Sequence, residues 1–419
     1  MHLLSNARSC IAIGLAVYCI ATLAGEPDAP EHHDPLQVNQ QLTLRDLLLK
    51  TFERNPIQHE LLAMDSVARA RAVHAGGILP AAPSVMMRHQ TDTLGSGRGE
   101  SEWEAGLELP VWLPGQRDAR TALAQIAASD LEASRSALLL KTAGDLRDAL
   151  WNIRMNSHLA ELAELRLRTA RALQNDVERR FRAGELARTD TMLAENDTLL
   201  ANSQLVRAQA ELMHARHRYT VLSGMIEMPG RIEEPLAEQT ALDATHPLIH
   251  ELETKLSLAQ NERELVQVER RENPQVLLSA RSLRGAFDSQ HNDSVGITVR
   301  IPLDTETRAA PLLAAAESNI SRALSDLERL RFVMQTALHE AQHNLETTRS
   351  ELAILQRQDS LARENQRLAK KAFDLGEIDL VSLMRVQALG YEAERALGSK
   401  QIQLQWDIAR VNQALGVVP

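Results

Sequence analysis

The sequence repeats itself at a spacing of 192 residues. FRAGELARTDTML, which begins at Phe181, aligns with FDLGEIDLVSLMR, which begins at Phe373. At nearly the same offset, PIQHEL at residues 56–61 matches PLIHEL at 247–252, and ELP at 108–110 falls on RIP at 300–302. Because a long-period repeat is the signature of a duplicated structural unit, we expect two copies of one unit.

Proline placement and apolar spacing predict long helices in the later part of each half. No proline occurs between Pro114 and Pro229 or between Pro311 and Pro419, and proline breaks helix interiors. In the second half the apolar residues follow steps of three and four, with only Thr348 interrupting, which is coiled-coil spacing. The seam consists of Leu327, Leu330, Met334, Leu338, Ala341, Leu345, Leu352 and Leu355. Each half should therefore end in a helical hairpin, at residues 116–224 and 311–416.

Between the first helix of each half and its hairpin, the period changes from helical to alternating. SEWEAGLELPVWL opposes apolar residues such as Trp103 and Leu107 to polar residues such as Glu104 and Glu108, and SVGITVRIPL repeats the pattern. Alternation of this kind predicts strands, and we expect strand pairs at 83–111 and 274–302. Two interpretations stay open: two soluble hairpins on a small core, or part of a membrane barrel that several chains complete.

The N-terminus has the plan of a secretory signal peptide. A single Arg8 precedes the apolar run from Cys10 to Leu23, which is short for a membrane span. We expect a signal peptide at 1–24, a polar segment at 25–41, a first repeat at 42–228 and a second at 229–419. Both cysteines lie in the signal, so the mature chain would have no disulfide or thiolate ligand; whether Cys19 carries a lipid is open. The net charge of −10 argues against nucleic acid as a partner.

One short motif suggests an enzyme. HEAQH, at residues 339–343, fits the H-E-x-x-H pattern of zinc peptidases. At the repeat offset it falls on RDALW, residues 147–151, which has no ligand pair. It also lies deep in a predicted rod, where no compact domain can supply a third ligand. We therefore interpret HEAQH as ordinary helix residues, and the sequence predicts no catalytic residue, metal site or cofactor.

The order of these features resembles the TolC-type outer membrane factors. The resemblance rests on two copies of helix, strand pair and long hairpin, on the tips RFRAGELARTD and AFDLGEIDLVS, on the endings LSG and ALG, and on LTLRDLLLKTFERNP near the start. It covers about residues 42–416. The modest length and the absence of a C-terminal tail are similar to the heavy-metal efflux subgroup.

The resemblance implies a mainly α-helical fold with a small β part. Three chains would share one 12-stranded barrel in the outer membrane, and their helices would form a periplasmic tunnel. The chain would conduct substrates passively, heavy-metal cations among the candidates, from an inner-membrane transporter of the RND type and a periplasmic adaptor. The tip residues that would contact the adaptor are Gly184, Glu185, Leu186, Gly376, Glu377 and Ile378.

Some members of this family close the periplasmic end with two rings of aspartate after the second tip. Here the corresponding positions hold Ser382 and Arg385, and the first repeat has Asp190 and Leu193. The double-aspartate gate is therefore absent, and we expect Arg385, paired with Asp190, to line the constriction together with Ser382. The competing interpretation of the whole chain is a periplasmic coiled-coil scaffold or adaptor without membrane strands.

Overall fold

The computed structural model describes residues 36–243, 245–303 and 306–419. The predicted signal peptide and most of the polar segment that follows it lie outside the described residues. The first half contains β1 (Gln37–Asn39), α1 (Leu44–Arg54), α2 (Gln58–Gly76), β2 (Ser84–Thr91), β3 (Ser101–Pro110), α3 (Gln116–Arg182) and α4 (Arg188–Ser223). The second half contains β4 (Glu227–Pro229), α5 (Pro247–Val268), β5 (Gln275–Arg284), β6 (Asn292–Arg300), α6 (Glu306–Asp374) and α7 (Leu380–Ala414).

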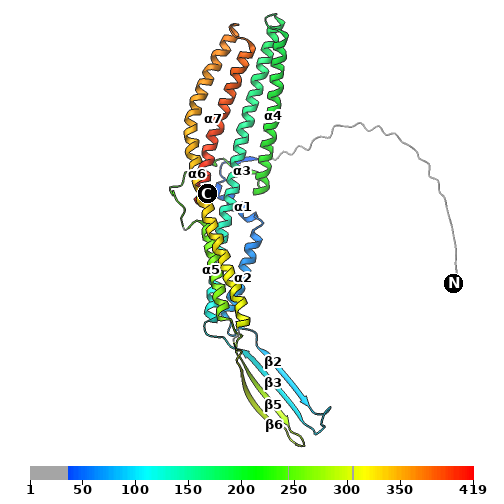
Figure 1. The fold of residues 1–419 in the computed structure, drawn as a ribbon. Coiled ribbons are helices and arrows are strands. Elements are labelled where there is room, and N and C mark those ends of the chain that lie inside the picture. The colour runs from blue at the N-terminus through cyan, green and yellow to red at the C-terminus, as the bar shows by residue number, and fades with distance from the viewer. Residues whose placement is uncertain (1–35, 244, 304–305) are drawn as a thin grey trace, which may run out of the picture.

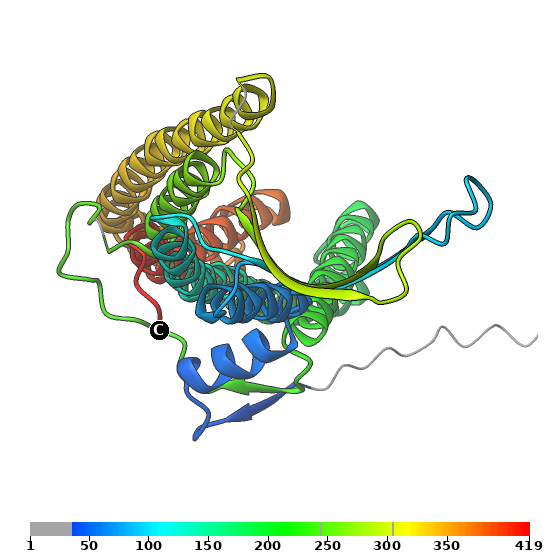
Figure 2. The same ribbon diagram turned by 90° about the horizontal axis from the view of Figure 1, so that it is seen from below.

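The chain is a long rod with the tips of two helical hairpins at one end and a β-sheet at the other (Figure 1). Helices α3 and α6 run most of its length, and the 69 residues of α6 correspond to about 100 Å. Towards the tips α3 packs against α4 and α7, and towards the sheet it packs against α2 and α5; α6 packs against α7 and α5. Viewed along the rod, the helices follow an arc and the sheet bends towards the same side (Figure 2).

The two copies differ at mid-height. Strands β1 and β4 form a small parallel sheet that the sequence did not predict, and α1 has no helical counterpart in the second half. Helix α1 buries Leu47, Leu48 and Phe52 on one face. The corresponding segment, 236–246, has only two large apolar residues, Leu236 and Leu242. It cannot present a similar face, and its described residues, 236–243 and 245–246, are not helical.

A buried ion pair lies at mid-height, beside the largest apolar cluster. The side chains of Arg147 on α3 and Glu234 in the loop after β4 are 4% and 8% exposed and approach to 2.6 Å. Arg147 also donates to Gln413 Oε1 at 2.5 Å and to the carbonyl oxygen of Val417 at 3.0 Å. One guanidinium therefore connects the first hairpin, the inter-repeat loop and the C-terminal segment.

The interruption in the α6 apolar seam also has a structural role. Thr348 is buried, and its hydroxyl donates to Asp407 on α7 at 2.7 Å. Gln403 donates to the other carboxylate oxygen of Asp407 at 2.7 Å. Because burial of a carboxylate without hydrogen bonds is unfavourable, the Thr348 hydroxyl stabilises the buried Asp407 at this point of the seam.

We predict that Arg147→Ala lowers the free energy of unfolding by about 3–5 kcal/mol, because Glu234 is left buried without its partner. Denaturant unfolding of the detergent-extracted protein measures this. Arg367→Ala is the matched control: Arg367 pairs with Glu364, but both side chains are more than half exposed. Its removal should cost at most about 1 kcal/mol. Equal losses in the two variants would contradict the structural role given to Arg147.

Candidate functional site

The two halves join in one four-stranded antiparallel sheet of order β2-β3-β5-β6. Strand β3 of the first half pairs with β5 of the second, with Leu107 opposite Leu278 and Trp103 opposite Ser282. Strands β2 and β6 form the two edges, and neither pairs with a further strand in the described chain. The sheet thus contains the two predicted strand pairs, side by side.

One face of this sheet is apolar across all four strands. Residues directly opposite each other in the ladders share a face, which places the apolar residues of the four strands together. This face consists of Val85, Met87, Trp103, Ala105, Leu107, Leu109, Val276, Leu278, Ala280, Val295, Ile297 and Val299. Among the described elements no helix covers this face: Val295 is 89% exposed and Ile297 is 73% exposed.

The opposite face is polar and includes the less exposed residues of β3. Glu102, Glu104 and Glu108 are half-buried, whereas Trp103, Ala105 and Leu107 between them are exposed. Glu102 forms an ion pair with Arg281 on β5, in which Arg281 Nε lies 2.8 Å from Glu102 Oε1. This distribution is the reverse of that in a soluble sheet, where the apolar face is the covered one.

Small residues occupy the middle of the polar face. Gly106, Ser279 and Gly296 lie side by side on β3, β5 and β6. A Cβ atom at Gly106 would lie 2.7 Å from Leu277 Cδ1 and 3.1 Å from the Leu278 carbonyl oxygen, so a larger residue would displace the neighbouring strand. Glycine therefore permits the close approach of β3 and β5 at this row.

The strand lengths fit the apolar band of a bilayer. The four strands have 8, 10, 10 and 9 residues, and a tilted strand crosses the hydrocarbon in about 9–11 residues. An exposed apolar face with a polar face behind it suits contact with lipid on one side and water on the other. Among the described helices, none carries an apolar stretch long enough to span a membrane.

The two hairpin tips have the same backbone geometry. Gly184 has φ 83° and Gly376 has φ 78°, in the left-handed region that favours glycine. The N–H of Gly184 bonds to the carbonyl of Phe181 at 2.9 Å, and that of Gly376 to the carbonyl of Phe373 at 3.0 Å. In both tips the N–H of the next residue, a glutamate, bonds five residues back at 2.9 Å. Both helices thus end in the same Schellman motif.

The tip side chains divide into a packed and an exposed set. Leu186 and Ile378 pack against an apolar cluster that includes Val177 and Phe373. Glu185 and Glu377 are exposed, and a Cβ atom at Gly184 or Gly376 would meet no atom within 4 Å. The glycines and glutamates therefore present open backbone and negative charge at the end of the rod. Of the residues predicted to contact an adaptor, Gly184, Glu185, Gly376 and Glu377 lie in this surface, whereas Leu186 and Ile378 pack against the apolar cluster. The contact with an adaptor stays a prediction.

The residues predicted for the constriction lie just beyond the tips, but they make local contacts. The Asp190 carboxylate accepts the N–H of Ala187 at 3.0 Å and caps α4. Ser382 bonds to Asp379 through its backbone N–H at 2.8 Å, and hydrogen bonding from Ser382 lowers the pKa of Asp379. Arg385 is exposed and forms no ion pair with Asp190 within the described chain. Within the described chain α4 and α7 each pack against α3, and the constriction formed by Asp190, Ser382 and Arg385 stays a prediction.

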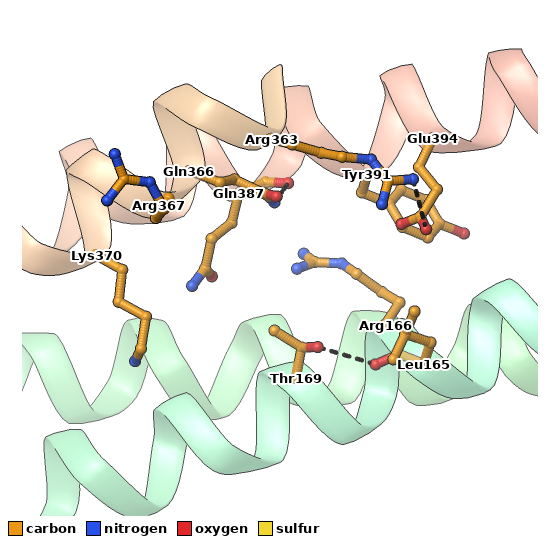
Figure 3. A pocket seen from close by; sticks show the side chains of 10 residues that line it. All are labelled: Leu165, Arg166, Thr169, Arg363, Gln366, Arg367, Lys370, Gln387, Tyr391 and Glu394. Atoms are coloured by element: carbon orange, nitrogen blue, oxygen red, sulfur yellow. Dashed lines mark hydrogen bonds and ion pairs between the residues drawn. The ribbon is translucent and has the colours of Figure 1, made fainter. Parts of the chain in front are cut away.

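A basic hollow of about 380 Å³ separates the two hairpins between mid-height and the tips (Figure 3). Arg166 projects from α3 towards Arg363 and Tyr391 on the second hairpin, with Arg367 and Lys370 further along. Much of this charge is already paired: Arg166 with Asp197 at 2.5 Å, and Arg363 with Glu394 at 3.4 Å. Sequence reasoning missed this hollow, because its residues come from helices almost 200 positions apart.

The HEAQH residues lie in the middle of α6 with both histidines exposed. The rings of His339 and His343 are parallel, with centroids 6.4 Å apart and an interplanar angle of 6°. Among the described residues, no group of three or more histidine, cysteine, aspartate or glutamate side chains is placed to hold a metal ion. Nothing on this face of α6 forms the walled cleft that a peptidase needs.

Comparison with known proteins gives a match in structure alone. No protein-family model matches the sequence, and no curated protein is similar to it in sequence. Among solved structures, the outer membrane protein VceC of Vibrio cholerae is similar with a TM-score of 0.71 at 16% identity, over 89% of this chain and 96% of VceC.

Two further solved structures are similar over comparable lengths. The CmeC outer membrane channel of Campylobacter jejuni gives a TM-score of 0.71 at 14% identity, over 97% of this chain and 94% of CmeC. The open state of the MtrE outer membrane channel of Neisseria gonorrhoeae gives 0.67 at 19% identity, over 89% of each chain. The expectation of a mainly helical chain with a small β part is confirmed, and the chain has the fold of these outer membrane channels.

Proposed function

We propose that this protein is the outer membrane channel of a tripartite efflux pump and conducts its substrates passively. The observation that carries the proposal is the sheet, with its exposed apolar face, half-buried polar face and two unpaired edges. Such a sheet is unstable in water, since its apolar face is uncovered and its edges invite pairing. In a bilayer the same face contacts lipid, and further copies of the chain satisfy the edges.

The oligomer we propose is a homotrimer. Three copies of the four-stranded sheet would supply 12 strands to one closed barrel, which removes every edge. The helical layer has matching unpartnered edges: exposed apolar residues recur every seven positions on α4 and on α6. These are Met192, Leu199, Val206 and Met213 on α4, and Ile354, Leu361 and Leu368 on α6, with Leu375 one residue past the end of α6. Two heptad stripes of equal length suit antiparallel packing of α4 on the α6 of the next copy.

The rod would then form a periplasmic tunnel with the hairpin tips at its inner end. We propose that the open backbone and the glutamates of the two tips contact a periplasmic adaptor. The adaptor would join the channel to an inner-membrane transporter of the RND type. Heavy-metal cations are candidate substrates through the resemblance in sequence alone. The exposed Arg385 would line the tunnel near the tips.

The alternative is a periplasmic scaffold or adaptor without a membrane barrel. The helical hairpins alone would suit that function, because long coiled coils are common in both classes. The sheet does not suit it, since a scaffold in water has no use for a continuous exposed apolar face that extends over four strands. The exposed, two-histidine HEAQH segment gives no support to an enzyme.

We predict that Ile297→Arg reduces the amount of assembled protein in the outer membrane and the channel conductance it gives in planar bilayers. A charge on the lipid face costs about 2–4 kcal/mol near the bilayer centre. Thr298→Arg is the matched control, because the adjacent residue lies on the polar face of the same strand. If both variants assemble and conduct like the wild type, the apolar face does not contact lipid and the channel proposal fails.

The tip surface is tested by cross-linking. We expect a photoreactive residue at position 377 to form a product with a second protein in cells, because Glu377 is exposed at the end of the rod. The control is position 392, which is also exposed but lies on α7, about four turns from the tip. Products of equal yield at the two positions would argue against docking at the tips.

The constriction is tested by conductance in the closed state. Arg385→Ala should raise it, because the substitution removes three bulky cations from a narrow ring in the proposed trimer. Arg395→Ala is the control: Arg395 is an exposed arginine on the same helix that pairs with Glu392. Unchanged conductance in Arg385→Ala would remove Arg385 from the constriction without affecting the channel proposal.

A further inference from the structure

Both unpartnered edges of the helical layer carry a pair of histidines. His339 and His343 are one turn apart on α6, and His214 and His217 are one turn apart on α4. All four side chains are exposed. Within the described chain, neither His339 nor His343 makes a hydrogen bond or ion pair. Their two rings lie parallel to each other.

The pairs lie on the stripes that face away from the chain's own core. On α4, His217 follows Met213 by four residues and continues the exposed stripe of Met192, Leu199 and Val206. On α6, His339 follows the exposed Phe332 by seven residues, and His343 precedes Ile354 by eleven, which is three turns. Residues spaced in this way share one face of a helix, so each pair extends an apolar stripe.

The two pairs also lie at the same height along the rod. The part of α4 that contains His214 and His217 packs at the level of Leu146 to Trp151 on α3, through Ala215 and Tyr219. The same part of α3 reaches Gln413 and Trp406 on α7. In turn, α7 packs at this level against Leu338 and Leu345 of α6, which bracket His339 and His343.

Ring closure brings the two pairs together. In a closed ring the copies are related by pure rotation about one axis, without translation along it. Residues of equal height on opposite edges of one chain therefore meet at equal height across each seam, where α4 of one copy packs on α6 of the next. Such a site rests on the trimer proposed above and is incomplete without the second copy.

We propose that each seam between copies holds a divalent transition-metal ion, of which Zn²⁺ is the test case, between His339 and His343 of one chain and the His214–His217 pair of the next. Two histidines one turn apart on a helix can bind one zinc ion, and four imidazoles complete a tetrahedral set. This site is distinct from peptidase chemistry, because a full set of protein ligands leaves no open position for substrate. The bound ions would hold neighbouring copies of the chain together at mid-height.

The test measures how zinc changes the dissociation of the trimer. Protein extracted in mild detergent is stripped with a chelator, its mass is confirmed, and the temperature at which it separates into single chains is measured with and without ZnCl₂. The variants are His339→Ala with His343→Ala, and His214→Ala with His217→Ala. The control is His59→Ala with His250→Ala, since these histidines are also exposed but lie near the starts of α2 and α5.

Zinc should raise the dissociation temperature of the wild type and of the control, with one ion bound per chain, and have no effect on either pair variant. Loss of zinc binding in the α6 variant alone would overturn the shared site, because the ion would then bind within one chain. A trimer that does not respond to zinc would overturn it as well and leave the channel intact. A stripped protein that is a single chain would overturn both proposals.

Discussion

The four-stranded sheet has an apolar face that no other element of the described chain covers. Side chains such as Val295 and Ile297 are exposed, while the glutamates of β3 are half-buried. Burial of apolar surface is the main favourable contribution to folding, and here the chain forgoes it at one end of the rod. In the proposed trimer, a bilayer would cover the apolar face and further copies of the chain would pair with the two sheet edges.

Duplication explains how one chain contributes a curved layer, and divergence explains how the copies differ. The position of Arg147, which is buried and holds three segments together, corresponds to His339, which is exposed on the opposite edge. One copy used the position for the chain's own mid-height core. The other leaves it exposed, on the surface that a neighbouring copy would meet in the proposed trimer.

The sequence predicted those elements that depend on local patterns. Alternation around Trp103 and Val295 located the strands, and the glycines at 184 and 376 located the tips. The sequence could not predict contacts between distant segments. Glu234 lies 87 residues from Arg147, and no local pattern connects the two. The three-residue strands β1 and β4 were missed because they are too short for a period. The pairing of Asp190 with Arg385 at the constriction stays a prediction, because the two residues lie on α4 and α7, and the described chain contains no ion pair between them.

The mass and the location of the mature protein test the proposed trimeric channel most directly. Inner and outer membranes are separated, the protein is extracted in mild detergent, and the protein mass of the complex is determined by light scattering. If the protein is the proposed trimeric channel, the result is an outer membrane species of three chains, in which the sheet edges are paired and the apolar faces are turned to lipid. A soluble single chain or dimer in the periplasmic fraction would contradict it, and the sheet would then belong to a periplasmic scaffold.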